Sequence, residues 1–174
     1  AGNPGIEELP GLVVSIFAVL TVYYLSRYVE QEAEIRETIQ TKNDRLRTFR
    51  KAIEHAGHAI FLTDTDGTIT YANQAVESVT GYSRGEVLGE NPSLWKSNAH
   101  DEAFYREMWE TILEGQVWDG QIINERKDGT RSWVDMTIAP IVNDEGNVEQ
   151  FVAVDTDITE RRKRKERITE QNEQ

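Results

Sequence analysis

The 174-residue chain contains no cysteine. This absence excludes disulfide bonds, thiolate metal sites, iron–sulfur clusters, cysteine nucleophiles and cysteinyl–flavin photochemistry. Lysine is also scarce, because only 6 of the 19 basic residues are Lys, whereas 31 residues are acidic and the formal net charge is -12. An acidic, lysine-poor composition is typical of a protein that stays soluble in high salt. It also argues against a nucleic-acid partner, since phosphate binding requires clustered Lys and Arg.

One stretch near the N-terminus has no charged side chain. Residues 9–26 carry no Asp, Glu, Lys or Arg, tyrosines gather at the far end, and Arg27 follows. Eighteen helical residues extend about 27 Å, close to a hydrocarbon thickness of about 30 Å. We therefore predict a transmembrane helix over residues 9–27, preceded by an extracytoplasmic or inter-helix loop at 1–8. The positive-inside tendency then predicts localisation at the cell membrane with the rest of the chain cytoplasmic. A buried core helix, or a helix packed on a partner, is the alternative.

Apolar residues then recur at alternating spacings of three and four over about four heptads. These seam positions are Leu25, Tyr28, Ile35, Ile39, Leu46, Phe49 and Ile53, interrupted by Glu32 and Lys42. The pattern predicts a coiled coil over residues 28–56. We expect a parallel homodimer, because a lone helix would expose the stripe to water. The alternative is an amphipathic helix that packs on its own domain.

Residues 57–157 supply the material for a packed core. The predicted strands span 59–63, 68–71, 118–125, 132–141 and 148–156. Helix ends are indicated by Gly81 as a C-cap, by Ser83 with Glu86 as a capping box, and by Asp101 as an N-cap. The order of these elements predicts an α+β domain with one sheet, helices on one face, and room for a small ligand between the layers.

Short motifs occur across this region in a fixed order. They are Leu62-Thr63-Asp64 with Asp66-Gly67, Tyr71-Ala72-Asn73, Thr80-Gly81-Tyr82-Ser83, Gly89-Glu90-Asn91-Pro92, Trp118-Asp119-Gly120, Asn124-Glu125-Arg126-Lys127-Asp128-Gly129 and Asp157-Ile158-Thr159-Glu160-Arg161. In this order they resemble a PAS domain followed by its PAC motif, over about a hundred residues. The resemblance implies the PAS fold, a five-stranded antiparallel sheet in the order 2-1-5-4-3.

Taken together, the parts resemble haloarchaeal membrane-bound sensor histidine kinases. The resemblance implies a membrane-anchored sensory module for signal transduction in a two-component system, dimeric through the coiled coil and the PAS domain. Residues 158–174 would form the output helix toward a downstream kinase or other output domain. Signal relay is expected through Asp155, Asp157, Ile158 and Thr159, with Thr159 capping that helix. The chain has no phospho-acceptor box or ATP site, so no catalytic residues are expected, and any kinase domain would belong to a longer parent chain.

The candidate pocket residues are Asn73, Trp95, Trp118 and Asn124. The Trp118-Asp119-Gly120 stretch with Asn124 is similar to FAD-binding PAS domains, in which an indole lies near the isoalloxazine and an Asn amide meets its polar edge. The identity of any cofactor is unknown from the sequence: we expect none, and FAD is the alternative. For the function, the alternatives to the relay module are an FAD-binding redox-sensing PAS domain or a ligand-free PAS dimerisation and interaction module. Haem-binding members of the family use a helix histidine, but His100 precedes its helix and is expected in an exposed loop. No metal site is predicted, because His55 and His58 lack further ligands.

Overall fold

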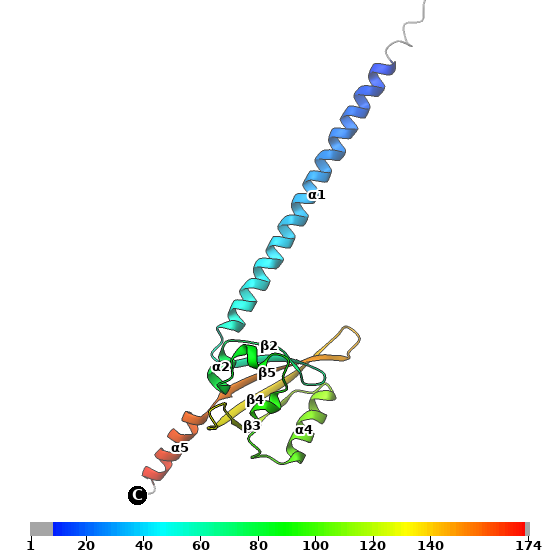
Figure 1. Ribbon diagram of the computed structural model, residues 1–174. Coiled ribbons are helices and arrows are strands. Elements are labelled where there is room, and N and C mark those ends of the chain that lie inside the picture. The colour runs from blue at the N-terminus through cyan, green and yellow to red at the C-terminus, as the bar shows by residue number, and fades with distance from the viewer. Residues whose placement is uncertain (1–8, 173–174) are drawn as a thin grey trace, which may run out of the picture. The chain divides into compact units, whose positions relative to one another are not determined.

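The computed structural model describes residues 9–172, and the chain divides into two units at Arg50 and Lys51. The predicted loop at residues 1–8 lies outside the described residues. Figure 1 colours the elements along the chain. In order they are α1 (Leu9–Glu54), β1 (Ala59–Asp64), β2 (Ile69–Ala72), α2 (Ala75–Thr80), α3 (Arg84–Val87), the 3-10 helix η1 (Pro92–Trp95), α4 (Glu102–Leu113), β3 (Trp118–Glu125), β4 (Arg131–Val142), β5 (Val148–Asp157) and α5 (Thr159–Asn172).

The described part of the unit up to Arg50 belongs to α1, and the apolar side chains that the structure describes there are exposed. The seam residues in this unit are each more than half exposed, namely Leu25, Tyr28, Ile35, Ile39, Leu46 and Phe49. Charged and other polar residues occupy most of the intervening positions, and Arg36 pairs with Glu32, which interrupts the seam one turn earlier. The helix therefore presents an apolar stripe that its own unit leaves uncovered.

Within the part of the chain that the structure describes, no helix combines the length and apolarity that a bilayer crossing requires. The apolar stretch of α1 gives way at Arg27 to charged residues in nearly every turn, whereas a span needs about 20 predominantly apolar residues. The predicted transmembrane helix over residues 9–27, and with it the predicted localisation at the cell membrane, is therefore wrong.

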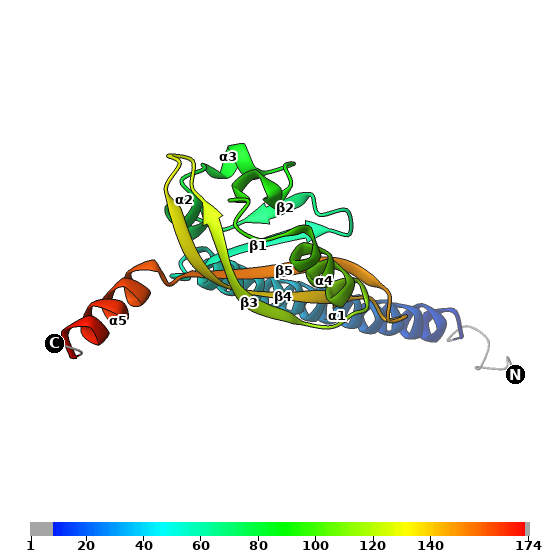
Figure 2. The same ribbon diagram turned by 90° about the horizontal axis from the view of Figure 1, so that it is seen from below.

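The second unit is built on one antiparallel sheet with the strand order β2-β1-β5-β4-β3. This order confirms the topology that the PAS resemblance implied. Helices α2, α3 and α4, with η1, cover one face of the sheet (Figure 2). The last strand, β5, runs along the middle of the sheet and leads directly into α5. The central strand β5 and the C-terminal helix α5 are thus separated by a single residue, Ile158.

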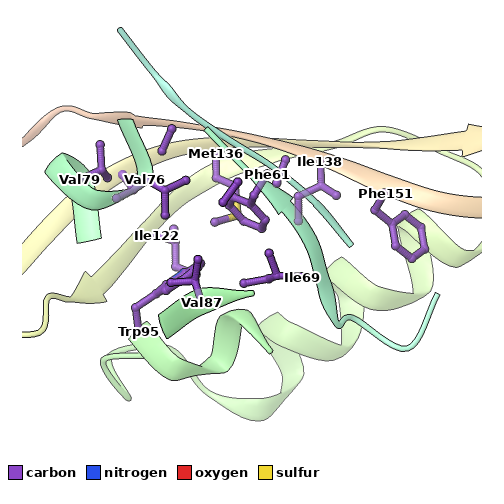
Figure 3. Close-up of a cluster of buried hydrophobic side chains, with 14 of the residues drawn as sticks. Phe61, Ile69, Val76, Val79, Val87, Trp95, Ile122, Met136, Ile138 and Phe151 are labelled. Atoms are coloured by element: carbon purple, nitrogen blue, oxygen red, sulfur yellow. The ribbon is translucent and has the colours of Figure 1, made fainter. Parts of the chain in front are cut away.

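Side chains that alternate along each strand form the core between sheet and helices. On β4, Val134, Met136 and Ile138 are buried, while the residues between them are more exposed. Figure 3 shows the side chains of Met136 and Ile138 pointing toward Val87 and Trp95 from the covering segments. The period of two therefore fixes which face of each strand is covered.

The local signals for helix ends are confirmed. Gly81 adopts the left-handed conformation, with φ of 79°, and its N–H bonds to the carbonyl of Glu77. The Asp101 side chain accepts a hydrogen bond from the N–H of Phe104 at 2.9 Å. The Glu86 carboxylate accepts the N–H of Ser83, also at 2.9 Å. Local capping chemistry thus positions the helices that enclose the site.

Candidate functional site

A cavity of about 190 Å³ lies between the sheet and the covering helices. Its apolar wall comes from both layers, as Figure 3 shows for several of its residues. The sheet contributes Phe61, Ile122, Met136, Ile138, Phe151 and Ala153, and the covering segments contribute Trp95, Met108, Trp109 and Ile112. Two of the lining strands are β4 and β5. The C-terminal end of β5 leads into α5.

Three polar side chains of the wall come together at one side of the cavity. Asn124 is 6% exposed, and among the described residues its amide makes no hydrogen bond. The hydroxyl of Tyr105 is buried and has no hydrogen-bond partner among residues 9–172, and burial raises the pKa of Tyr105. The Lys96 ammonium lies 4.0 Å from the centre of the Tyr105 ring. Lys96 also forms an antiparallel bridge with Asn124, which places the two side chains on the same face.

The segment from Lys96 to His100 is attached to the edge of β3 by hydrogen bonds. The hydroxyl of Ser97 donates to the carbonyl of Ile123, and the N–H of Ile123 donates to Nε2 of His100 at 2.9 Å. The His100 ring stacks on Phe104 with ring centres 4.3 Å apart. His100 is therefore a half-buried structural residue and not the exposed loop residue expected from the sequence, and its Nε2 lone pair is not free for haem.

Trp95 and Asn124, two of the four predicted pocket residues, line the cavity. Trp118 lies outside the wall and packs edge-on against Phe104, with ring centres 5.6 Å apart. A Cβ atom at Gly120 would come within 2.9 Å of the Trp118 ring. The Trp118 indole therefore packs against the backbone of Gly120, and none of the three residues of the Trp-Asp-Gly motif lines the cavity.

Asn73, the fourth predicted pocket residue, is buried at the junction between the end of α1 and β1. Its Oδ1 accepts the N–H of Ile60 at 2.9 Å. Its Nδ2 donates to the carbonyls of Ile53 and His58 at 2.9 and 3.0 Å. Nearby, the Tyr71 hydroxyl donates to the Glu54 carboxylate at 2.8 Å. Asn73 is therefore a residue of the N-terminal junction, and it does not line the cavity.

The start of α5 is held to the sheet by a cluster that we call the α5 clamp: Arg126, Trp133, Asp157, Ile158 and Thr159. The N–H of Ile158 donates to the carbonyl of Trp133, and the N–H of Trp133 donates to Oγ1 of Thr159, both at 2.9 Å. The N–H of Thr159 donates to Asp157 at 2.8 Å, and Arg126 forms an ion pair with Asp157. The Thr159 hydroxyl thus bonds to β4 instead of capping its own helix.

The electrostatics of the clamp favour an ionised Asp157. Partial burial raises the pKa of this carboxyl, but hydrogen bonding from Thr159 and the charge of Arg126 outweigh burial, so the pKa lies below its ordinary value. Arg162, one turn into α5, lies over the Trp133 ring at 3.7 Å. The structure therefore brings Asp157, Ile158 and Thr159 together with Arg126 and Trp133, which the sequence did not single out as relay residues.

Asp155 is set apart from the clamp. It pairs in register with Ala59 of β1 and Met136 of β4 and is 1% exposed, and in the described part of the chain neither carboxyl oxygen has a hydrogen-bond partner. Burial without a compensating partner raises the pKa of Asp155 to about 8. The group is consequently protonated over most of the neutral range, unlike Asp157.

The fold and these junctions define a sensory PAS domain. The PAS-domain family profile matches residues 57–160, so the chain belongs to this family. It is 42% identical over 111 residues to the nitrogen fixation regulatory protein of Klebsiella pneumoniae, covering 64% of this chain and 22% of that protein. It is 32% identical over 114 residues to the blue-light-activated histidine kinase of Brucella canis, covering 64% and 23%.

An archaeal relative and a solved structure extend the comparison. The bacterioopsin transcriptional activator of Halobacterium salinarum is 33% identical over 99 residues, covering 57% of this chain and 15% of that protein. A solved light-oxygen-voltage domain, studied with a flavin analogue, is 27% identical with a TM-score of 0.59, covering 73% of this chain and 96% of that one. The match spans less than a quarter of each of these three curated relatives. The chain therefore contains a PAS domain that is related to those of signalling sensors.

Proposed function

We propose that this chain is the sensory and coupling part of a signalling protein, in which the PAS domain relays a stimulus to a downstream histidine kinase of a two-component system. The observation that carries the proposal is the α5 clamp, which joins the ends of β4 and β5 to the first turn of α5. The relationship to a histidine kinase from Brucella canis supports the output class.

The clamp lies on the same two strands that line the cavity. Met136 and Ile138 of β4, and Phe151 and Ala153 of β5, line the cavity wall. Trp133 of β4 and Asp157 of β5 hold α5. A change in cavity occupancy that shifts β4 relative to β5 would alter the clamp geometry, because packed strands move as units with few intermediate arrangements. The output helix would then change its position or its local stability.

The relay is tested by fusing the chain to the catalytic core of a histidine kinase and measuring autophosphorylation. We expect Asp157→Ala to shift the fusion's kinase activity by at least about fivefold, equivalent to a coupling of about 1 kcal/mol, while the circular dichroism spectrum stays unchanged. Asp144→Ala, which removes the same charge from the exposed β4–β5 turn, is the matched control. Unchanged activity in a folded Asp157→Ala fusion would contradict the relay.

We further propose that α1 forms a parallel dimeric coiled coil and that the PAS domain contributes to the homodimer. The exposed seam, which repeats over heptads, supports this assembly. Ile39→Lys places a charge on the seam and is expected to shift the dimer toward monomer in sedimentation equilibrium. Thr41→Lys adds the same charge off the seam and should leave the dimer intact. Equal behaviour of the two variants would contradict the coiled coil.

We propose that the protein works in high salt, as a haloarchaeal sensor would. The net charge of -12 and the identity of 33% to a Halobacterium salinarum protein support this assignment. Screening of carboxylate repulsion predicts that the thermal midpoint rises between 0.1 and about 2 M KCl. A midpoint that stays constant or falls over this range would contradict the proposal.

FAD binding is the alternative, and the light-oxygen-voltage domain studied with a flavin analogue is the observation that favours it. The fit is poor, however. A cavity of 150 Å³ accommodates one benzene ring, and the cavity of about 190 Å³ is only slightly larger, whereas an isoalloxazine has three fused rings. The absorption spectrum of the purified protein near 450 nm distinguishes the two, since a flavin band that survives gel filtration would establish the alternative.

A further inference from the structure

The size of the cavity restricts its ligand to one ring with a small substituent. An apolar cavity of 150 Å³ binds benzene, and the cavity here measures about 190 Å³. The difference of about 40 Å³ is room for about three heavy atoms, since a cavity needs about 10–15 Å³ of this volume to hold one water. This space matches one additional group of a few heavy atoms on the ring.

The apolar part of the wall is suited to an aromatic ring. Phe61 and Trp95 meet edge-on with ring centres 5.5 Å apart, and Trp109 and Phe151 meet in the same way at 6.0 Å. All four rings line the cavity. Aromatic rings favour offset and edge-to-face contacts with one another, so this wall favours an aromatic guest over an aliphatic one of equal volume.

The charge of the wall selects an anion. Lys96 is the single charged residue among those lining the cavity, although the chain as a whole carries a net charge of -12. None of the ion pairs among the described residues involves Lys96. Lys96 is therefore a cation at the cavity wall of an acidic protein, and it has no carboxylate partner among the described residues.

The neutral polar groups of the wall also present donors. The Tyr105 hydroxyl is buried without a partner, and the amide of Asn124 makes no hydrogen bond among the described residues. An unpaired buried polar group costs about 1–3 kcal/mol. The Lys96 ammonium, the Tyr105 hydroxyl and the Asn124 amide nitrogen can all donate to one acceptor. A carboxylate supplies two oxygens with about four acceptor sites for them.

We infer that the cavity binds a monocyclic aromatic carboxylate, with the ring between the aromatic side chains and the carboxylate facing Lys96, Tyr105 and Asn124. Such a ligand would be the stimulus of the proposed sensory function. The effect of the ligand on signalling rests on that proposed function, whereas binding of the ligand to the cavity does not. Binding is therefore measured on the chain alone, whereas the relay is measured on the kinase fusion, so the two proposals fail separately.

The probes are benzoate and its neutral analogue benzamide, titrated calorimetrically into the purified chain. We expect benzoate to bind at least about tenfold more tightly than benzamide. Lys96→Gln should abolish this preference, and Tyr105→Phe should reduce benzoate affinity by about threefold. Lys163→Gln, which removes an exposed lysine of α5, is the matched control and should bind as the wild type does.

The location of binding is tested by the methyl signals of methionine. Both methionines of the chain, Met108 and Met136, line the cavity, so ¹³C-methyl labelling reports on the cavity selectively. Benzoate is expected to shift both signals, with the same affinity as in calorimetry. Equal affinity for benzoate and benzamide, a preference that persists in Lys96→Gln, or methyl signals that do not move at 10 mM benzoate (about a hundredfold above a Kd of 0.1 mM) would each overturn the inference.

Discussion

Two polar side chains at the junctions of the PAS domain are hydrogen-bonded, whereas two in its interior have polar atoms without a partner among the described residues. Asn73, at the N-terminal junction, makes three hydrogen bonds to backbone that is distant in sequence, and Asp157, at the C-terminal junction, accepts the N–H of Thr159 and pairs with Arg126. Asp155 and Tyr105, in the interior, leave polar atoms without partners. Hydrogen-bonded polar groups hold neighbouring elements in place. A buried polar group without a partner raises the free energy of the folded state, and a bound proton or ligand can lower it again. The junctions thus suit transmission, and the interior suits detection.

The largest effect on the free energy of unfolding is expected from the ionisation of Asp155. Because its folded-state pKa is about 8 and the unfolded value is near 4, the folded state retains a proton that the unfolded state loses. Stability is therefore fully present below pH 4 and falls as pH rises to about 8, by roughly 5 kcal/mol. Asp155→Asn should flatten this dependence. Urea unfolding at several pH values measures it, and an equally steep fall in the variant would contradict the buried acid.

The next effect concerns Asn73 at the N-terminal junction. Asn73→Ala removes three hydrogen bonds and leaves the N–H of Ile60 without its side-chain acceptor. We expect a loss of about 3 kcal/mol in the free energy of unfolding. Gln74→Ala, at the exposed neighbouring position, should change it by less than about 0.5 kcal/mol. A small loss for Asn73→Ala would argue that water replaces the amide.

A smaller effect is expected at the α5 clamp. Thr159→Val keeps the side-chain shape but removes the acceptor for the N–H of Trp133, at a cost of about 1–2 kcal/mol. Thr169→Val makes the same exchange on the exposed part of α5, where the hydroxyl only bonds to Lys165 of its own helix. Denaturation curves compare the two, and similar losses would show that helix propensity alone is at work.

The smallest effect is expected from Tyr105. Its hydroxyl has no hydrogen-bond partner among the residues that the structure describes, so Tyr105→Phe should leave the free energy of unfolding within about 0.5 kcal/mol of the wild type, or raise it. Thermal denaturation without added ligand is the measurement. A loss above about 1.5 kcal/mol, the upper range for one net hydrogen bond, would mean that the hydroxyl is in fact paired.

Much of the domain could be predicted because its signals are local or periodic. The strands follow alternation with a period of two, and Gly81 and Asp101 mark helix ends through chemistry within one turn. Asn73 was misplaced because its partners lie 13 to 20 residues away along the chain. Motif order places a residue in a family but does not specify which backbone groups its amide will meet.

The same limit applies to the clamp and the cavity. Arg126 and Trp133 join the clamp through strand register, since β4 pairs with both β3 and β5, and single-sequence patterns do not determine register. The role of Lys96 depends on its bridge to Asn124, 28 residues further along. The exposed seam of α1 was predicted from its period, whereas the membrane assignment failed because an uncharged stretch near the required length is not sufficient.

The central claim is that Asp157 couples the sheet to the output helix locally. Hydrogen–deuterium exchange of wild type and Asp157→Ala tests it most directly, because α5 begins at Thr159 and its first amides depend on the clamp. We predict exchange at least about tenfold faster in the first two turns of α5, equivalent to about 1.4 kcal/mol of local stability, with the amides of β1 and β5 unchanged. A uniform increase across the domain, or unchanged exchange in α5, would contradict the claim.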